Sequence, residues 1–192
     1  IFDFAISLLM TIILSPILLV LIILIKLDDP GPAFFRQVRI TTYGRAFRIF
    51  KFRTMVVNAE ELGTQVTKEN DPRVTRVGNK LRKYRLDELP QLLNIITGDM
   101  SFVGTRPEVP RYVNCYSEEM LATLLLPAGV TSEASIMYKD ENELIGNAEE
   151  PDKVYVEKVL PDKMRYNLDA LRNFSFWGEL KTMFRTIGAV LK

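Results

Sequence analysis

The stretch "FAISLLMTIILSPILLVLIILI", residues 4–25, holds 22 residues without a single charge. A helix of that length is enough to cross the roughly 30 Å hydrocarbon layer of a bilayer. A cleaved signal peptide is disfavoured, because the apolar run is too long and no small-residue cleavage site follows Lys26. A buried core helix would carry a polar face, whereas here only two serines and one threonine are polar. We therefore predict a membrane element over residues 1–26.

Pro16 lies near the middle of this run and directly follows Ser15. A proline inside a helix removes a backbone donor and clashes with the carbonyl four residues earlier, so the helix kinks or breaks. In lipid the freed carbonyl needs a partner, which the hydroxyl of Ser15 or Thr11 can supply. Two topologies are compatible with these residues: a kinked helix that spans the bilayer, and a helix–break–helix that enters and leaves by one face.

A β-hairpin is predicted after the membrane element, with arms at residues 33–40 and 45–55 and a turn near Gly44. In the second arm two phenylalanines alternate with Lys51 and Arg53, so a strand period of two puts both cations on one face. An ordinary amphipathic strand with a solvated basic face is the alternative interpretation.

The remainder of the chain reads as a mostly helical α/β domain over residues 27–192. We expect a helical segment over residues 78–85 that leads into a second helical stretch over 86–96, which Gly98 ends, and then a loop. The acidic segment 139–153 is expected to be a solvated surface. Residues 174–192 are amphipathic, aromatic and basic, which suits a helix lying in the membrane interface. A helix packed on the domain core is the alternative there.

Composition removes whole classes of chemistry from consideration. The 192 residues include no histidine and a single cysteine, Cys115. Catalytic triads that need histidine, an internal disulfide and most zinc or copper centres are therefore excluded. The acidic residues that follow Cys115 do not favour an activated thiolate. The net charge of +1 gives no indication of nucleic-acid binding. The remaining candidates for catalytic groups are carboxylates, lysine, arginine and hydroxyls, together with a hard cation such as Mg²⁺.

The acidic pair Asp87-Glu88 stands just before Pro90 and an apolar run, with arginines on both sides in sequence. Near a helix start the helix dipole favours an ionised carboxylate, and a proline in the first turn costs little. A carboxylate nucleophile among cations suits phosphoryl transfer, because neutralising the charge of the phosphates is the main catalytic task. Mg²⁺ held by Asp87 and a diphosphate would share that task. A capping aspartate beside a surface glutamate is the structural alternative.

Five segments in order carry a resemblance to a known family: "LSPILL", "DDPGPAFFRQVRI", "FRIFKFRTM", "LRKYRLDELPQLLNIITGDMSFVGTRPE" and "NFSFWGELKTMFRTI". They resemble the monotopic phosphoglycosyl transferases, the bacterial sugar transferase family. The resemblance implies an enzyme on the cytoplasmic face of the bacterial inner membrane. Such enzymes transfer a phosphosugar from a UDP-sugar to a polyprenyl phosphate, commonly undecaprenyl phosphate, and release UMP. This is the first membrane step in building polysaccharides and other glycans.

The resemblance also implies roles for individual residues. Asp87 falls on the family's nucleophile, which forms a covalent phosphosugar intermediate with ping-pong kinetics. Glu88 falls on the second acid of the dyad, with two roles open: assisting the acceptor or positioning Mg²⁺. Ser15-Pro16 matches the family's helix–break–helix and favours a re-entrant membrane hairpin. The expected phosphate or nucleotide contacts are Lys51, Arg53, Arg82, Arg106 and Glu108.

Three segments depart from the family's common pattern: "KYRLDE", "GTRPE" and "LLLPAGVTSEASIMYKDENEL". The third segment bears on contacts to the nucleotide or sugar, so the residues do not identify the sugar. Larger relatives carry further N-terminal helices and a domain, and a chain that begins at Ile1 matches the catalytic part of one. A homodimer is compatible with the sequence. The competing functional hypothesis is a non-enzymatic membrane adaptor.

Overall fold

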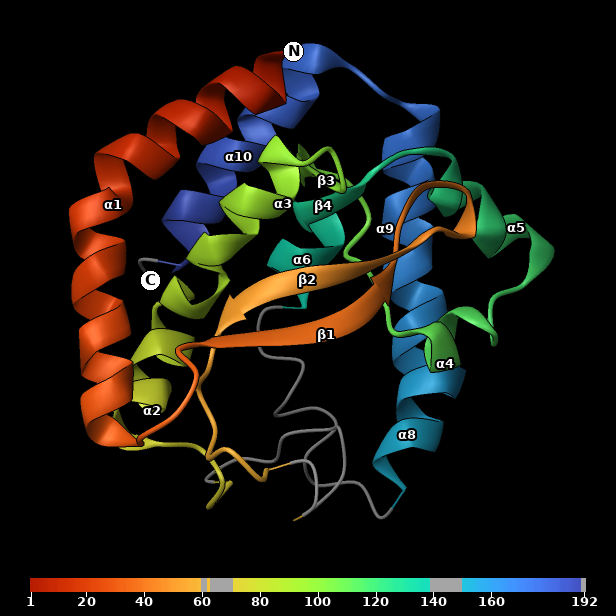
Figure 1. Ribbon diagram of the computed structural model, residues 1–192. Coiled ribbons are helices and arrows are strands. Elements are labelled where there is room, and N and C mark those ends of the chain that lie inside the picture. The colour runs from red at the N-terminus through yellow and green to blue at the C-terminus, as the bar shows by residue number, and fades with distance from the viewer. Residues whose placement is uncertain (60–61, 63–70, 139–149, 191–192) are drawn as a thin grey trace. The chain divides into compact units, whose positions relative to one another are not determined.

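The computed structural model describes residues 1–59, 62, 71–138 and 150–190 (Figure 1). Over these residues the protein is mostly helical, with two small two-stranded sheets, so the predicted fold class is confirmed at that level. The chain divides into two compact units. The first comprises Ile1–Gln37 and Arg48–Gly98, and the second comprises Val38–Phe47 and Asp99–Lys192. Most of the predicted acidic surface at 139–153 lies outside the described residues.

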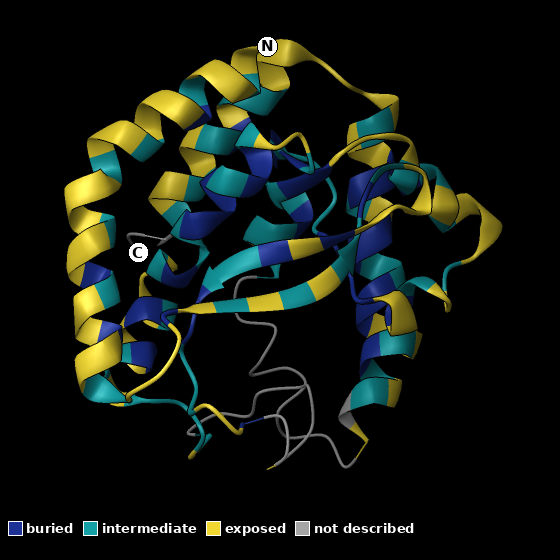
Figure 2. Cartoon of the chain, in the orientation of Figure 1, coloured by how far each residue is buried: buried dark blue, intermediate teal, exposed yellow. Residues whose placement is uncertain are grey.

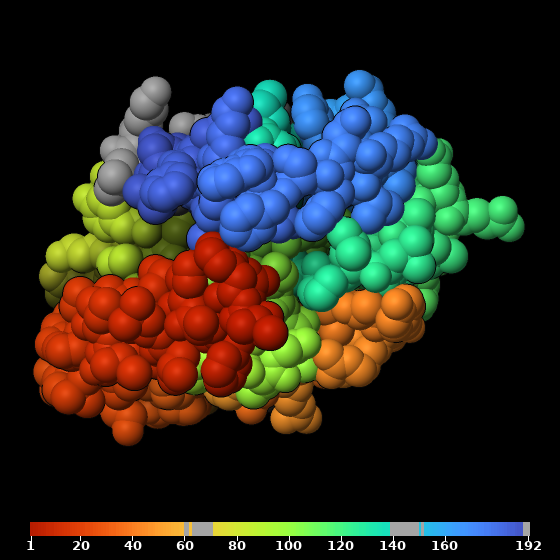
Figure 3. Space-filling model, turned by 90° about the horizontal axis from the view of Figure 1, so that it is seen from above, coloured from red at the N-terminus to blue at the C-terminus, as the bar shows by residue number. Residues whose placement is uncertain are grey.

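Helix α1 (Phe2–Asp28) carries the apolar run and belongs to the first unit. Most of it is exposed or half-buried, as the yellow and teal ribbon of Figure 2 shows, and its red surface is continuous in Figure 3. Near its C-terminal end Leu21 and Ile25 pack with Phe52 and Leu81 in a hydrophobic core. The helix is long and apolar enough to cross a membrane. A continuous exposed apolar surface of this size is typical of contact with lipid or a partner.

Pro16 bends α1 without interrupting it. The backbone is helical through Pro16, and Figure 1 shows a change of direction near the middle of the helix. The Ser15 hydroxyl donates a hydrogen bond of 2.7 Å to the carbonyl of Ile12. That carbonyl stands four residues before the proline and would otherwise lose its helical donor. The predicted hydroxyl partner is therefore confirmed, whereas the expected break is a bend in one continuous helix.

The predicted hairpin is confirmed as β1 (Phe34–Ile40) paired with β2 (Ala46–Phe52). The ring of Phe34 stacks on Phe52 with centroids 5.5 Å apart and meets Phe50 edge-on at 6.3 Å. The two phenylalanines of the second arm therefore contact one aromatic ring, as the strand alternation predicted. The turn between the arms is a short 3₁₀ helix, η1 (Thr42–Gly44).

The two predicted helical stretches are confirmed in outline, and the chain turns between them at Arg85. Helix α2 (Arg76–Lys83) ends before Arg85, which adopts the left-handed conformation with φ 54°. A 3₁₀ helix, η2 (Leu86–Gln91), starts there and leads directly into α3 (Leu92–Ile96). Left-handed backbone is uncommon for a residue with a side chain, so the sequence did not signal this turn. Gly98, with φ 76°, follows α3 and ends the segment as predicted.

The second unit contains a parallel pair of strands, β3 (Met100–Val103) and β4 (Ala128–Thr131). The loop predicted after Gly98 is therefore wrong over β3, whose partner lies far along the chain. Gly104 and Gly129 approach so closely that a Cβ on Gly129 would stand 2.1 Å from the Gly104 nitrogen. The other elements of this unit are α4 (Pro110–Val113), α5 (Glu118–Leu121), η3 (Ala122–Leu125), α6 (Glu133–Met137), α8 (Pro151–Val154), a π-helical turn η4 (Tyr155–Val159), α9 (Leu160–Arg172) and α10 (Phe176–Val190).

Helix α10 confirms the helix predicted near the C-terminus over the residues described there. Its contacts within the second unit are with α6, β3 and β4. Thr186 and Thr131 share a hydroxyl hydrogen bond of 2.6 Å, and Thr182 donates to Glu133 at 3.1 Å. The aromatic side chains of the helix are exposed, and Trp177 is 77% exposed. Polar residues thus attach α10 to its unit while large apolar side chains face away from the core.

Candidate active site

The residues that the sequence predicted to form a site are divided between the two units. Lys51, Arg53, Arg82 and the Asp87-Glu88 pair belong to the first unit, whereas Arg106 and Glu108 belong to the second.

Asp87 is buried in the first turn of η2, with 9% of its surface exposed. The left-handed Arg85 starts this 3₁₀ helix and so brings Asp87 back toward the end of α2. Arg82, in the last turn of α2, interacts electrostatically with Asp87. Burial lowers the pKa of the Arg82 guanidinium, and the charge of Asp87 opposes that shift. A guanidinium stays charged at neutral pH, so its field favours an ionised Asp87.

Glu88 has a different partner from its neighbour. The ammonium of Lys51, on β2, lies 3.0 Å from the Glu88 carboxylate. The two side chains are only 19% and 11% exposed, so water screens the pair weakly. The structure thus brings Lys51, Arg82 and both acids together around one turn of 3₁₀ helix. Arg82 interacts with Asp87, and Lys51 pairs with Glu88.

Asn94 is a site residue that sequence reasoning missed. Its amide oxygen accepts from the backbone nitrogen of Phe50 at 2.8 Å, and its amide nitrogen donates to the carbonyl of Arg48 at 3.1 Å. Both bonds join α3 to the edge of β2 and hold the acidic turn beside Lys51. Asn94 is the single polar residue in the apolar run 92–96. That position could have predicted a buried amide with hydrogen-bond partners, because buried polar groups are normally hydrogen-bonded.

Arg53 is buried by contacts with the chain that follows α1. Its Nε donates to the carbonyl of Pro32 at 2.7 Å, and its two terminal nitrogens contact the carboxylate and the carbonyl of Asp29. The guanidinium therefore joins the end of α1 to the end of β2. A phosphate contact by Arg53 stays a prediction, and it would require the side chain to give up some of these bonds.

Glu108 is a buried carboxylate of the second unit, 7% exposed. It accepts a hydrogen bond from the Tyr155 hydroxyl and lies 3.6 Å from Lys163 and 3.8 Å from Arg39. Its backbone carbonyl accepts from Ile40 at 3.0 Å. A carboxylate repels a phosphate, so this arrangement favours a structural role in which Glu108 fixes the loop that carries Arg106. No sequence pattern predicted Tyr155 or Lys163 as partners of Glu108.

The residues around Asp87 fit a magnesium ion only in part. Within the described parts of the chain, no group of three or more Asp, Glu, His or Cys side chains is placed to hold a metal. Mg²⁺ usually keeps several waters and takes one or two carboxylates together with substrate phosphates. Asp87 therefore fits as one protein ligand of an ion whose other ligands come from a diphosphate and water.

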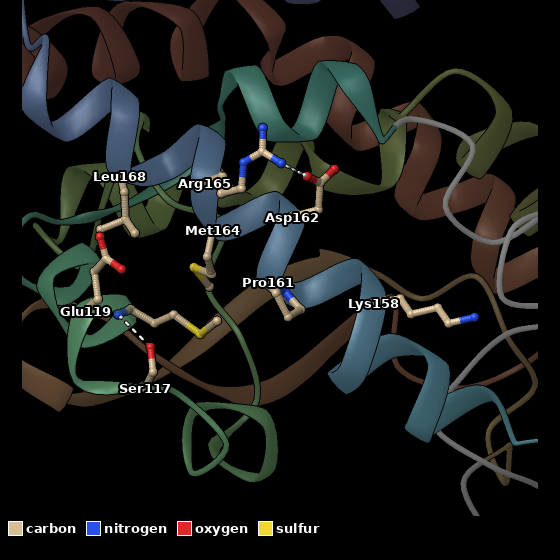
Figure 4. Close-up of a pocket in the computed structure, with 9 residues that line it drawn as sticks. Ser117, Glu119, Lys158, Pro161, Asp162, Met164, Arg165 and Leu168 are labelled. Carbon is tan, nitrogen blue, oxygen red and sulfur yellow. Dashed lines mark hydrogen bonds and ion pairs between the residues drawn. The ribbon is translucent and has the colours of Figure 1, made fainter.

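A hollow of about 370 Å³ lies elsewhere in the second unit, between α5 and α9 (Figure 4). Its charged lining residues are Lys158 and Arg165, which are cations, and Glu119 and Asp162, which are anions. Arg165 and Asp162 pair with each other at 3.1 Å. The balanced charge gives no net attraction for a phosphate, and none of the predicted site residues lines this hollow.

Comparison with known proteins shows the family to which the chain belongs. The profile of the bacterial sugar transferase family matches residues 1–192. The UDP-N-acetylgalactosamine-undecaprenyl-phosphate N-acetylgalactosaminephosphotransferase of Aeromonas hydrophila is 36% identical over 180 residues, 92% of this chain and 40% of that protein. The UDP-glucose:undecaprenyl-phosphate glucose-1-phosphate transferase of Escherichia coli K12 is 35% identical, over 96% of this chain and 38% of that protein.

A relative from Caulobacter vibrioides, also named UDP-glucose:undecaprenyl-phosphate glucose-1-phosphate transferase, is 35% identical over 98% of this chain and 68% of its own length. The chain thus spans about two fifths of the Aeromonas and Escherichia proteins and two thirds of the Caulobacter protein. The protein belongs to the bacterial sugar transferase family.

Proposed function

We propose that this chain is a membrane-bound phosphoglycosyl transferase. It moves a phosphosugar from a UDP-sugar to a polyprenyl phosphate such as undecaprenyl phosphate and releases UMP. The substrates are those in the names of the Aeromonas, Escherichia and Caulobacter relatives. The observation that carries the proposal is the buried Asp87 beside Arg82, one residue from the Lys51–Glu88 pair.

The reaction proceeds in two displacements at one phosphorus atom. A carboxylate oxygen of Asp87 attacks the sugar-bearing phosphorus of the donor. The bond between that phosphorus and the bridging oxygen breaks, and UMP leaves with the bond's electron pair. A phosphate oxygen of the polyprenyl phosphate then attacks the same phosphorus and displaces the Asp87 carboxylate. The products are a polyprenyl diphosphosugar and free enzyme, and the order of events gives ping-pong kinetics.

The cations around Asp87 make the first attack feasible. An anionic nucleophile is repelled by a diphosphate until the negative charge is neutralised. Lys51 and Arg82 contribute to that neutralisation from β2 and α2. Mg²⁺, bound by Asp87 and the diphosphate, would supply further charge neutralisation. Glu88 binds Lys51 in the resting protein and is placed to orient that lysine or to assist the acceptor.

The membrane attachment that we propose has two parts. α1 enters and leaves the cytoplasmic face of the inner membrane as a re-entrant hairpin, which the bend at Pro16 and the Ser15 hydrogen bond support. α10 lies in the interface with its exposed aromatic residues toward lipid, as its apolar and basic composition favours. Both attachments would keep the site close to a lipid-borne acceptor.

Trapping the intermediate tests the proposal most directly. Purified protein is incubated with Mg²⁺ and a panel of UDP-sugars in the absence of acceptor, and the peptide that contains Asp87 is weighed by mass spectrometry. We expect one donor to add a phosphosugar to that peptide and to release about one UMP per enzyme in a burst. UMP release on addition of acceptor without any adduct would contradict the covalent route. A non-enzymatic adaptor would give neither signal with any donor.

A further inference from the structure

Gln91 is the most deeply buried amide of the first unit that lacks a hydrogen-bond partner. Its residue is 1% exposed, and neither Nε2 nor Oε1 has a partner within the described residues. More than nine tenths of buried polar groups in folded proteins are hydrogen-bonded, because an unsatisfied group loses its water without compensation. Asn94 has the same burial and both of its amide groups are satisfied. Asn94 shows that this part of the protein can supply hydrogen-bond partners to a buried amide. The lack of partners for Gln91 therefore needs an explanation.

The position of Gln91 follows from its neighbours along η2 and α3. Residues three apart on a 3₁₀ helix share one side, so Gln91 lies on the side of Glu88. One turn further, Asn94 lies three residues beyond Gln91. Both flanking residues contact β2: Glu88 through the Lys51 ammonium, and Asn94 through the backbone of Arg48 and Phe50. Gln91 is therefore placed between them, on the side of the helix that faces β2.

We propose that Gln91 is a phosphate-contacting residue of this site and forms an oxyanion subsite with Lys51. A carboxamide offers a donor and an acceptor together. Its Nε2 donates to a phosphate oxygen that Lys51 neutralises, and its Oε1 accepts from a second N–H of the same ammonium. Lys51 has three N–H donors and can serve Glu88, Gln91 and an anion at once. Lys51 keeps 19% exposure, so an anion can reach its ammonium from solvent.

The inference rests on the proposed function, because the phosphate comes from one of its two substrates. The shared chemistry is a phosphate oxyanion, either in the diphosphate of a UDP-sugar or in the phosphate of the polyprenyl acceptor. A site that is preorganised for an anion would contain an unsatisfied amide in the ligand-free protein, and that amide would lower the stability of the protein until the anion binds.

The test uses the full chain in detergent and the variant Gln91→Met, which keeps the length of the side chain but removes both polar atoms. We expect its thermal midpoint without ligand to equal or exceed that of the wild type, because an unsatisfied buried amide is replaced by an apolar group. The matched control Asn94→Leu loses two satisfied bonds and should melt at a clearly lower temperature. Opposite directions for these two amides separate a ligand role from a structural role.

Binding is measured by calorimetry with three probes: inorganic pyrophosphate with Mg²⁺, UDP with Mg²⁺, and a short polyprenyl phosphate. For Gln91→Met we expect pyrophosphate and one of the two substrate-derived probes to bind about tenfold more weakly, which is about 1.4 kcal/mol. The substrate-derived probe that is affected identifies the source of the phosphate. Gln91→Glu adds a negative charge and should weaken binding further. The binding control is Glu119→Gln, at an exposed acid of the second unit, which should bind like the wild type.

Three results would overturn the assignment of Gln91. They are unchanged pyrophosphate affinity in Gln91→Met, no pyrophosphate binding by the wild type, and a fall in the Gln91→Met midpoint as large as that of Asn94→Leu. UMP release is followed separately. A wild type that binds pyrophosphate through Gln91 but turns over no UDP-sugar contradicts the proposed function alone. Normal turnover with unchanged pyrophosphate binding in Gln91→Met contradicts the Gln91 subsite alone.

Discussion

Asp87 and Glu88 are neighbours in the chain but have different electrostatic partners. Arg82 interacts with the buried Asp87, whereas the ammonium of Lys51 is paired with Glu88. In the proposed mechanism, Asp87 attacks phosphorus while Glu88 orients the positive charge of Lys51. The predicted division of labour between the two acids is therefore compatible with the local geometry.

Asp87→Asn should keep the fold and abolish turnover. The amide has the shape of the carboxylate but cannot form the acyl-phosphate intermediate, so we expect UMP release to fall by at least about 1,000-fold. Initial rates of UMP release measure this. The control Glu119→Gln makes the same chemical change at an exposed acid that pairs with Arg172, and should turn over normally. Near-normal release by Asp87→Asn would rule out Asp87 as the nucleophile.

Arg53→Met should destabilise the protein by about 2–3 kcal/mol. The change leaves Asp29 and two backbone carbonyls without the guanidinium that now serves them. The control is Arg45→Met, which breaks the pair with Asp99 at a side chain that is 54% exposed. Exposed pairs contribute about 0–1 kcal/mol, so the control should change little. Thermal midpoints by circular dichroism measure both variants, and equal shifts would contradict the structural role of Arg53.

Tyr112→Phe should lose stability in a way that depends on pH. The Tyr112 hydroxyl donates to Asp152 at 2.6 Å, and this bond, followed by contacts with Arg111, holds the pKa of Asp152 below its usual range. A lowered pKa in the folded state gives stability that is present above the unfolded pKa of about 4 and is lost as the pH falls through the folded value. We expect a deficit of at most about 1 kcal/mol at pH 7, because Asp152 is partly exposed.

Urea unfolding of Tyr112→Phe at pH 7 and at pH 3 measures that deficit, which should shrink at the lower pH. Tyr43→Phe, at a tyrosine that is 81% exposed, is the control and should show no pH-dependent difference from the wild type. A deficit in Tyr112→Phe that is equal at both pH values would contradict the linkage to Asp152.

At the scale of elements, short sequence patterns predicted the helices and strands whose formation depends on neighbouring residues. The charge-free run of residues 4–25 predicted α1, and the alternation of rings and cations predicted the hairpin. The strand β3 was missed because four residues carry little periodicity and their partner begins at Ala128. The turn at Arg85 was missed because a left-handed arginine is set by surrounding packing and not by its own preference.

The residues of the candidate site also divide into those that the sequence predicted and those that depend on tertiary packing. Spacing singled out the Asp87-Glu88 pair, because acidic residues beside an apolar run are visible in sequence, and the resemblance to the family added Lys51 and Arg82. The structure brings these residues together. The amides of Gln91 and Asn94 were missed, since their roles depend on burial and on which groups of β2 they meet. Burial of that kind is a product of tertiary packing, and one sequence does not report it.

Pro16→Leu tests the proposed re-entrant shape of α1. Leucine restores the backbone donor and removes the ring that clashes with the carbonyl of Ile12, so the helix should straighten and span the bilayer. In a Cys115→Ser background, single cysteines at Phe2 and Lys26 are labelled from one side of sealed vesicles. Both positions should react from the same side with Pro16 present. In Pro16→Leu they should react from opposite sides, and an unchanged same-side pattern would contradict our prediction.

At the scale of the whole molecule, each unit has one helix with a large exposed apolar surface: α1 in the first and α10 in the second. Isolated apolar residues on a surface need no explanation, but a continuous apolar surface on a helix is typical of membrane or partner contact. We propose that both helices bind lipid.

The single tryptophan of the chain, Trp177 on α10, reports the second of these attachments. We expect its fluorescence in vesicles to be quenched by brominated lipids and to be protected from iodide, because the ring sits at headgroup level. Protein in mild detergent gives the reference spectrum. Full access to iodide in vesicles, with no quenching by brominated lipids, would show that α10 faces water.

The hairpin of β1 and β2 contributes to both units, since its tip, Val38–Phe47, belongs with the second. Within that unit the Thr41 hydroxyl donates to the carbonyl of Asp99 at 2.8 Å and accepts from the nitrogen of Ala128 at 3.2 Å. A chimera of two family members joined once, after Gly98, would therefore give one parent's tip to the other parent's second unit. Recombination between relatives that is meant to exchange donor preference has to transfer residues 38–47 and 99–192 as a matched set.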